Sequence, residues 1–357
     1  MGQRDEADGL QLSAQGGSSP DADTQQAAEQ GKSATREFVP APLLGGAHLQ
    51  TILGSVLRGS SRLHGTRMRR LRLADGDQLV LCDNTPLSWQ DGCPVVLLLH
   101  GLAGSSDSGY MQRVTAKLNE RELRVFRLNH RGCGAGAGLA DQPFHAGRTE
   151  DIAAAIALVE SLCPGSPISV VGFSVSGNAL LRYLGEISAG VPAAIRLGIA
   201  VCPPIDLLTS VRCLQTTAGG RFYDRYFCRK LCRQITGSRL WKEHLPLVQY
   251  GRMPQGLLEF DDLFTAPASG FSSAEDYYSK ASASAVIAKI TVPVQILAAA
   301  DDPVVDTRPL LEVKRPANVR LRITSAGGHL GYIGQSKVDP DRRWMDWRIV
   351  DWLTAGF

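Results

Sequence analysis

The chain has 357 residues, of which 44% are hydrophobic and 20% charged, a balance typical of a protein that buries a sizeable core. Its 38 basic and 35 acidic residues give a net charge of +3, too small a bias to indicate a nucleic-acid partner. No apolar stretch approaches the roughly 18 to 20 residues of a membrane span, and the first residues lack the apolar segment of a secretory signal. We therefore expect a cytoplasmic protein without a membrane-spanning segment.

The N-terminal part of the chain differs in composition from the rest. Residues 1–36 are rich in small and polar side chains, which predicts a flexible tail because too little apolar surface is available for burial. After it, alternating apolar residues around Asp75-Gly76-Asp77 predict a hairpin across residues 69–81. Short apolar runs typical of buried strands then follow at residues 95–99, 125–128, 168–171, 197–201, 294–298 and 319–323.

These strand patterns alternate with helical ones, which predicts an α/β fold with a mostly parallel sheet flanked by helices. The alternation stops over residues 204–289, and an inserted, largely helical cap is the natural interpretation. The expected α/β core then comprises residues 37–203 and 290–357. The eight cysteines form no CxxC pair and have no metal-type spacing with histidine, so we expect reduced thiols, no metal and no cofactor.

A candidate nucleophile follows the apolar run at residues 168–171. The sequence Gly172-Phe173-Ser174-Val175-Ser176 stands between an expected strand and an expected helix, the setting of a nucleophile elbow. A sharp turn there would present the Ser174 hydroxyl to a base. Ser176 departs from the G-x-S-x-G pattern, in which the last residue is glycine.

An acid and a base follow the last two expected strands. Asp301 and Asp302 come directly after one strand, and His329 lies in a glycine-rich loop after the other. The carboxyl ends of parallel strands meet at one edge of a sheet, and the order Ser, Asp, His is that of the α/β hydrolases. We favour Asp302 as the acid and assign Asp301 to loop hydrogen bonding, although spacing alone leaves the choice open.

The loop after the first central strand completes the constellation. His100-Gly101-Leu102 could supply the Leu102 N–H, which together with the Val175 N–H would form an oxyanion hole. In isolation the same residues would indicate only a strand-ending turn. The remaining histidines are expected to be structural or exposed: His48, His64, His130, His145 and His244.

Two further groups of charged residues have simpler interpretations. Arg131 lies in a glycine-rich loop and is expected to form a structural ion pair. Glu259, Asp261 and Asp262 form an acidic cluster without histidine at ligand spacing, so we expect them to anchor cap helices and not to bind a metal.

The cap sequence carries a local excess of positive charge. Between residues 206 and 243 there are eight basic and three acidic residues, interleaved with aromatic ones. One hypothesis is peripheral membrane contact, with a basic amphipathic surface resting on anionic lipid. The other, which the sequence favours, is an ordinary solvated helical face.

From about residue 38 to the C-terminus the chain resembles a known family, the YheT-like α/β hydrolases of the AB hydrolase 4 type. The resemblance rests on residues 47–51 (AHLQT), 100–102 (HGL), 129–133 (NHRGC), 145–151 (HAGRTED), 259–262 (EFDD), 276–278 (DYY) and 327–331 (GGHLG). It implies a triad of Ser174, Asp302 and His329 and the hydrolysis of carboxylic esters with short or medium acyl chains.

Two other functions fit the same residues. An acyl-enzyme intercepted by an alcohol would make the protein an alcohol acyltransferase or ester synthase. A hydrolase fold without activity would serve as a binding module. The preferred hypothesis is a serine ester hydrolase acting on a small-molecule ester, lipid esters included, and the sequence gives no indication of oligomeric state.

Overall fold

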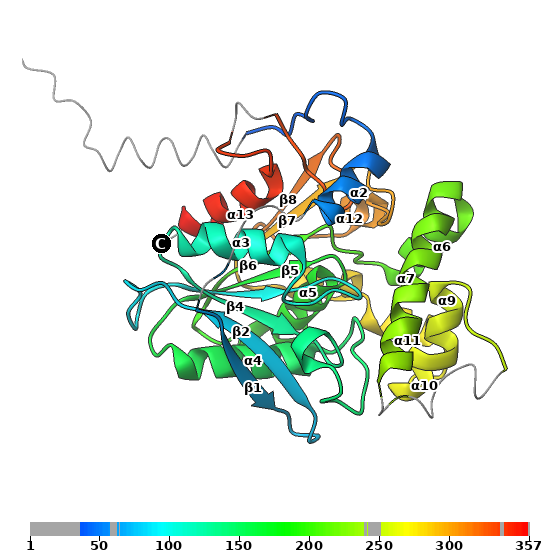
Figure 1. Cartoon of the computed structure of the whole chain (residues 1–357), viewed down its shortest axis with the longest axis horizontal. Coiled ribbons are helices and arrows are strands. Elements are labelled where there is room, and N and C mark those ends of the chain that lie inside the picture. The colour runs from blue at the N-terminus through cyan, green and yellow to red at the C-terminus, as the bar shows by residue number, and fades with distance from the viewer. Residues whose placement is uncertain are drawn as a thin grey trace, which may run out of the picture.

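The computed structural model describes residues 36–57, 63, 65–238, 241, 251–335 and 339–355. It contains an eight-stranded sheet with the strand order β1-β2-β4-β3-β5-β6-β7-β8 (Figure 1). The strands are β1 Arg67–Arg72, β2 Gln78–Asn84, β3 Val95–Leu99, β4 Arg124–Asn129, β5 Ile168–Phe173, β6 Ile195–Val201, β7 Val294–Ala299 and β8 Val319–Thr324. The tail expected at residues 1–36 lies outside the described residues except for Arg36.

Most of the sheet is parallel, as expected. β1 pairs antiparallel with β2, and β2 with β4, whereas every pair from β4 through β3, β5, β6 and β7 to β8 is parallel. The hairpin predicted around Asp75-Gly76-Asp77 is confirmed, and Gly76 has the positive φ of 94° that a tight turn requires there. All six apolar runs form strands, so the predicted fold class is confirmed.

Helices cover both faces of the sheet (Figure 1). On one face, α4 (Thr149–Leu162) and α5 (Val175–Ile187) pack side chains such as Ile156 and Leu180 into an apolar cluster with the strands. On the other face, α3 (Gly109–Asn119) and α13 (Trp344–Thr354) form a second cluster. Two shorter helices and four 3₁₀ turns lie around the sheet: α2 Ala47–Val56, α12 Arg308–Glu312, Gly134–Gly136, Ser188–Gly190, Ala283–Ala285 and Ile287–Lys289.

The segment between β6 and β7 carries a separate group of helices that gather beside the sheet (Figure 1). These are α6 Leu207–Thr216, α7 Ala218–Gly237, α9 Leu257–Phe260, the π-helix Asp261–Thr265, α10 Ala266–Ala268 and α11 Ala274–Ala281. They share an apolar cluster that includes Val175 and Val304, which stand at the carboxyl ends of β5 and β7. The helices therefore contact the edge of the sheet at which parallel α/β folds place their sites.

Arg131 ties three distant segments together, which confirms its structural interpretation. Its side chain is 1% exposed and donates to Asp151 on α4 through Nε (2.8 Å) and Nη2 (2.7 Å). Nη1 donates to Asp75 Oδ2 (2.6 Å) and Asp77 Oδ2 (2.5 Å) in the β1–β2 turn. The guanidinium fits this role because it offers several donors in a fixed plane.

We expect Arg131→Met to lower the free energy of unfolding by about 3 to 5 kcal/mol, because it leaves buried carboxylates without their cation. Urea unfolding monitored by circular dichroism measures this change. Arg131→Lys keeps the charge but loses the planar set of donors, so it should be less destabilising. A Met variant as stable as the wild type would show that the network contributes little.

Candidate active site

Ser174 occupies a strained turn between β5 and α5. Its backbone has φ 54° and ψ −122°, a conformation that non-glycine residues rarely adopt, and its N–H donates to the Val201 carbonyl of β6 at 2.7 Å. The turn needs glycine before it, since a Cβ on Gly172 would lie only 2.4 Å from the carbonyl oxygen of Ser176. This is the geometry that the elbow motif predicts.

The structure brings Ser174, Asp302 and His329 together from the ends of three strands. His329 Nε2 lies 2.9 Å from Ser174 Oγ, and His329 Nδ1 lies 2.8 Å from Asp302 Oδ2. The second oxygen of Asp302 accepts the N–H groups of Val304 (2.8 Å) and Val305 (3.0 Å). With its carboxylate fixed in this way, Asp302 can orient the imidazole while Nε2 faces the hydroxyl.

The neighbouring Asp301 has a different partner. Its Oδ1 accepts the N–H of Gly328 at 2.9 Å, which braces the loop that carries His329. From the other side, Thr51 Oγ1 on α2 accepts the N–H of His329 at 2.9 Å. The loop bonding expected for Asp301 is therefore present, and the carboxylate in contact with the imidazole is that of Asp302.

Asp302→Asn should lower kcat by about 10⁴-fold, because an amide cannot hold the imidazole in the tautomer that accepts the serine proton. The matched control is Asp301→Asn, whose amide oxygen can still accept the Gly328 N–H. Its kcat should fall by less than about tenfold. Steady-state hydrolysis of a chromogenic ester by both variants measures the difference. Equal losses would contradict the assignment.

Leu102 and Val175 stand where an oxyanion hole requires donors. Leu102 follows β3, Val175 is the first residue of α5, and both line the same pocket as Ser174. Among the residues that the structure describes, neither of their backbone N–H groups has a hydrogen-bond acceptor. Free N–H groups at a helix N-terminus and an adjacent loop are suited to stabilise a developing negative charge.

Ser176 is completely buried, and its environment explains why glycine is not needed here. Its hydroxyl donates to the carbonyl of His100 and lies 2.8 Å from His130 Nε2. Because the hydroxyl hydrogen goes to His100, Nε2 of His130 must carry the proton that it shares with Ser176. The backbone N–H of His130 in turn donates to the ring Nε2 of His100 at 3.2 Å. These hydrogen bonds fix the loop that precedes Leu102.

The histidines outside the triad are structural or exposed where they are described. Burial lowers the pKa of His100 to about 4 and that of His130 well below its ordinary value, so both rings are neutral at pH 7. Burial, helped by Arg148, lowers the pKa of His145 to about 3. His48 is exposed on α2, and His64 and His244 lie outside the described residues.

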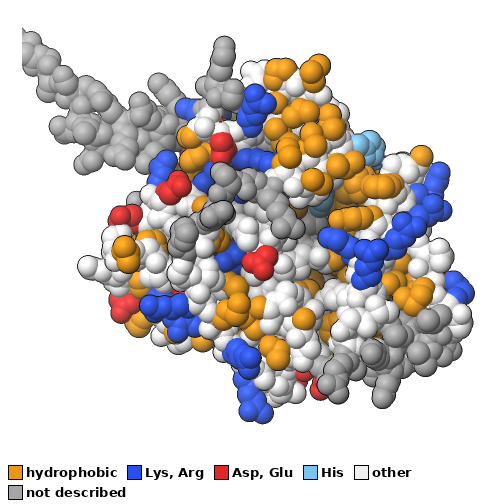
Figure 2. Space-filling view, in the orientation of Figure 1, with side chains coloured by type: hydrophobic (Ala, Val, Ile, Leu, Met, Phe, Trp, Pro, Cys, Tyr) orange, Lys and Arg blue, Asp and Glu red, His pale blue; other side chains and the backbone are white. Residues whose placement is uncertain are grey.

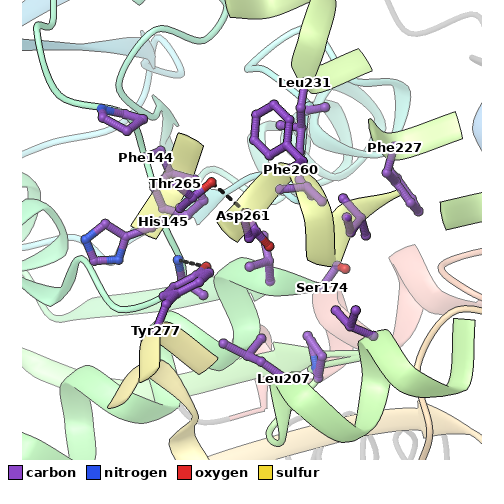
Figure 3. Close-up of a pocket in the computed structure, with 18 of the residues that line it drawn as sticks. Phe144, His145, Ser174, Leu207, Phe227, Leu231, Phe260, Asp261, Thr265 and Tyr277 are labelled. Atoms are coloured by element: carbon purple, nitrogen blue, oxygen red, sulfur yellow. Dashed lines mark hydrogen bonds between the residues drawn. The ribbon is translucent and has the colours of Figure 1, made fainter. Parts of the chain in front are cut away.

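The pocket above Ser174 is predominantly apolar (Figure 3). Its walls come from the core loops and from the helices between β6 and β7, and they include Leu102, Phe144, Leu207, Val211, Leu214, Phe227, Leu231, Phe260, Phe264 and Tyr277. A pocket of this composition is suited to a hydrocarbon chain attached to the group that reacts at Ser174.

Asp261 is a polar feature of this pocket that the sequence did not reveal. Glu259 and Asp262 bind backbone N–H groups, as the anchoring interpretation predicts. Asp261 also anchors a helix, because it accepts hydrogen bonds from Thr265 Oγ1 and from Tyr278 OH on α11, each at 2.6 Å, but it lines the pocket as well, from a π-helical turn. Burial raises its pKa to about 6 despite these bonds.

The raised pKa of Asp261 makes its contribution to stability depend on pH. The folded protein holds the proton up to about pH 6, whereas the unfolded chain releases it near 3.8, so folding is favoured at low pH and loses this contribution as pH rises through 6. As the pH is raised from 4 to 7.5, the free energy of unfolding of Asp261→Asn should therefore increase by about 2 to 3 kcal/mol relative to that of the wild type. Urea unfolding at both pH values tests this, and a constant difference would contradict it.

One group of side chains has the donor set of a metal site among the residues that the structure describes. Ligand atoms of Cys202, Asp302 and His329 lie within 4.8 Å of one another. Burial, with the neighbouring Asp302 carboxylate, raises the pKa of the Cys202 thiol well above its ordinary value, so the thiolate that metals prefer is disfavoured. Asp302 and His329 are also engaged with each other, and we interpret the group as the triad beside a buried thiol.

Comparison with known proteins agrees with the fold described above. A family model described as the alpha/beta hydrolase fold matches residues 94–335. The chain is 28% identical over 327 residues to YheT of Escherichia coli, covering 90% of this chain and 94% of YheT. It is 29% identical over 342 residues to the monoacylglycerol lipase ABHD2 of Danio rerio, covering 90% and 78% of the two chains. It is 28% identical over 275 residues to the phospholipase ABHD3 of Mus musculus, covering 75% and 66%.

Solved structures show the same fold at lower identity. The Pyrococcus furiosus esterase Pf2001 is 20% identical, with a TM-score of 0.53 over 89% of this chain and 98% of the esterase. The 2,6-dihydroxy-pseudo-oxynicotine hydrolase is 15% identical, with a TM-score of 0.54 over 87% of this chain and 71% of the hydrolase. The resemblance to YheT-like hydrolases that the motifs indicate is confirmed, and the chain belongs to the α/β hydrolase fold family.

Proposed function

We propose that the protein hydrolyses carboxylic esters through an acyl-enzyme formed on Ser174. The observation that carries the proposal is the 2.9 Å contact between Ser174 Oγ and His329 Nε2, with His329 Nδ1 at 2.8 Å from Asp302. Oγ would attack the ester carbonyl and pass its proton to Nε2, which returns that proton to the departing alcohol. Water would then attack the acyl carbon by the same route, releasing the acid and restoring the hydroxyl.

The negative charge of each tetrahedral intermediate needs donors at a fixed position. We assign this role to the N–H groups of Leu102 and Val175, which have no acceptor among the described residues and flank Ser174 in the pocket. Donors that are already in place require no rearrangement when the charge develops, and each such donor typically contributes about 10² to 10³ in rate.

The apolar pocket supports an ester with a short or medium acyl chain as substrate. Relatives named monoacylglycerol lipase and phospholipase support the ester-hydrolase class and include lipid esters among the candidates. We further propose that residues 204–289 act as a cap that shapes this pocket, since its helices supply Leu207, Phe227 and Phe260 to the wall. The cytoplasmic location stays a prediction of the sequence.

A fluorophosphonate probe tests for an activated serine because it reacts only where a base and an oxyanion hole assist the hydroxyl. We expect the wild type to be labelled and Ser174→Ala to be unlabelled, with a loss of at least about 10⁴-fold in ester hydrolysis. In-gel fluorescence and a chromogenic ester assay measure the two effects.

The matched control is Ser210→Ala, since Ser210 lines the same pocket but donates its hydroxyl to the carbonyl of Asp206 at 2.9 Å. This variant should keep its labelling. Folded wild-type protein that is not labelled would contradict the proposal and favour a binding module without activity.

A further inference from the structure

Helix α2 exposes an apolar face. Leu49, Ile52 and Val56 are 40%, 42% and 65% exposed, and their spacing of three and four residues places them on one side of the helix. Leu57, directly after the helix, is 48% exposed. Single exposed apolar residues are ordinary, but a contiguous group on one helix face indicates a surface that is covered during function.

Helix α7 lies beside α2 and exposes a basic, aromatic edge. The two helices meet where His48 stacks on Tyr223, with Nδ1 of His48 at 3.1 Å from the tyrosine hydroxyl. Phe222 (58%) and Tyr226 (41%) are exposed in one row with the exposed cations Arg221, Arg225, Arg229, Lys230 and Arg233. Figure 2 shows hydrophobic side chains gathered over α2 and basic ones beside them over α7.

The described residues do not neutralise the positive charge of this edge through salt bridges. None of the five cations forms a salt bridge with another of the described residues. The acidic residue of α7, Asp224, points inward, where it is 6% exposed and accepts the N–H of Leu257 at 2.7 Å. Cations that form no salt bridge with a described residue, next to exposed apolar side chains, are complementary to a surface that is both anionic and apolar just below its charged layer.

We propose that this α2–α7 surface, formed by Leu49, Ile52, Val56, Leu57, Phe222, Tyr226 and the five α7 cations, docks onto a bilayer that contains anionic phospholipid. The apolar side chains would enter the interfacial layer while the cations contact lipid phosphates. A second copy of the chain is a poorer occupant, since a twofold interface would bring the two positive rows together. The exposed apolar face of α2 therefore favours peripheral membrane contact over an ordinary solvated face, the two hypotheses that the cap sequence left open.

The docking surface is the outer side of the candidate active site. Thr51, on the inner side of α2, accepts the N–H of His329, and Phe227 and Leu231 of α7 line the pocket. A lipid ester could therefore pass from the bilayer to Ser174 without crossing much water. This delivery rests on the proposed ester hydrolysis, but the docking itself does not.

Sedimentation of the full chain with vesicles tests the docking separately from catalysis, using Ser174→Ala as well as the wild type. Both should bind vesicles of phosphatidylcholine with phosphatidylglycerol, bind pure phosphatidylcholine much more weakly, and dissociate as salt is raised. We expect two variants to weaken binding by at least about tenfold: Arg225→Glu with Arg229→Glu, and Ile52→Ser with Val56→Ser. In the background that keeps Ser174, these two double variants should hydrolyse a water-soluble ester at the wild-type rate.

The matched control is Lys289→Glu with Arg320→Glu, the same charge change near the amino ends of β7 and β8, at the opposite edge of the sheet. This control should bind like the wild type.

The proposal is overturned if the wild type does not bind anionic vesicles, or if the control weakens binding as much as the α7 pair. It is also overturned if Ile52→Ser with Val56→Ser converts a dimer to a monomer, as ultracentrifugation would show, without changing vesicle binding. Binding by a protein that hydrolyses no ester would refute the proposed function and leave the docking intact.

Discussion

The whole site depends on the turn that carries the chain from β5 into α5 at Ser174. A serine held at φ 54° costs about 1 to 3 kcal/mol, which must be offset by the packing around it. That packing uses the absence of side chains at Gly172 and Gly177, where added Cβ atoms would press on neighbouring backbone and on Pro203. The backbone thus fixes the Cα–Cβ direction of Ser174 relative to the first N–H of α5, and the loops after β7 and β8 bring the acid and the base to its hydroxyl.

Those parts of the molecule that follow from local patterns could be read from the sequence. Apolar runs of four or five residues between helical segments predict buried parallel strands, and Asp75-Gly76 predicts a tight turn. The chain order of Ser174, Asp302 and His329 predicts a triad because each residue follows a strand, and the carboxyl ends of these three strands lie at the same edge of the sheet. Spacing could not separate Asp301 from Asp302, since both follow β7, and only the coordinates show which carboxylate reaches the imidazole.

Other features depend on contacts between segments far apart in the chain. Asp261 looks like its acidic neighbours in the sequence, and its place in the pocket results from the π-helical turn that rotates it toward Thr265 and Tyr278. Helix α2 contains no Asp, Glu, Lys or Arg and has no side-chain cap, so its sequence carries no clear start signal. Its position follows from tertiary contacts, because Gly54 packs directly against the backbone of Gly331 in the loop that carries His329.

The serine at position 176 has a consequence for how such motifs evolve. A glycine there would match the usual pattern of the elbow, yet it would leave the carbonyl of His100 and Nε2 of His130 buried without their partner. Buried polar atoms that lose their hydrogen bonds typically destabilise a protein by about 1 to 3 kcal/mol each. The serine and His130 thus form a pair whose members are best exchanged together, and restoring the common residue at one position alone would damage the loop that the motif is meant to support.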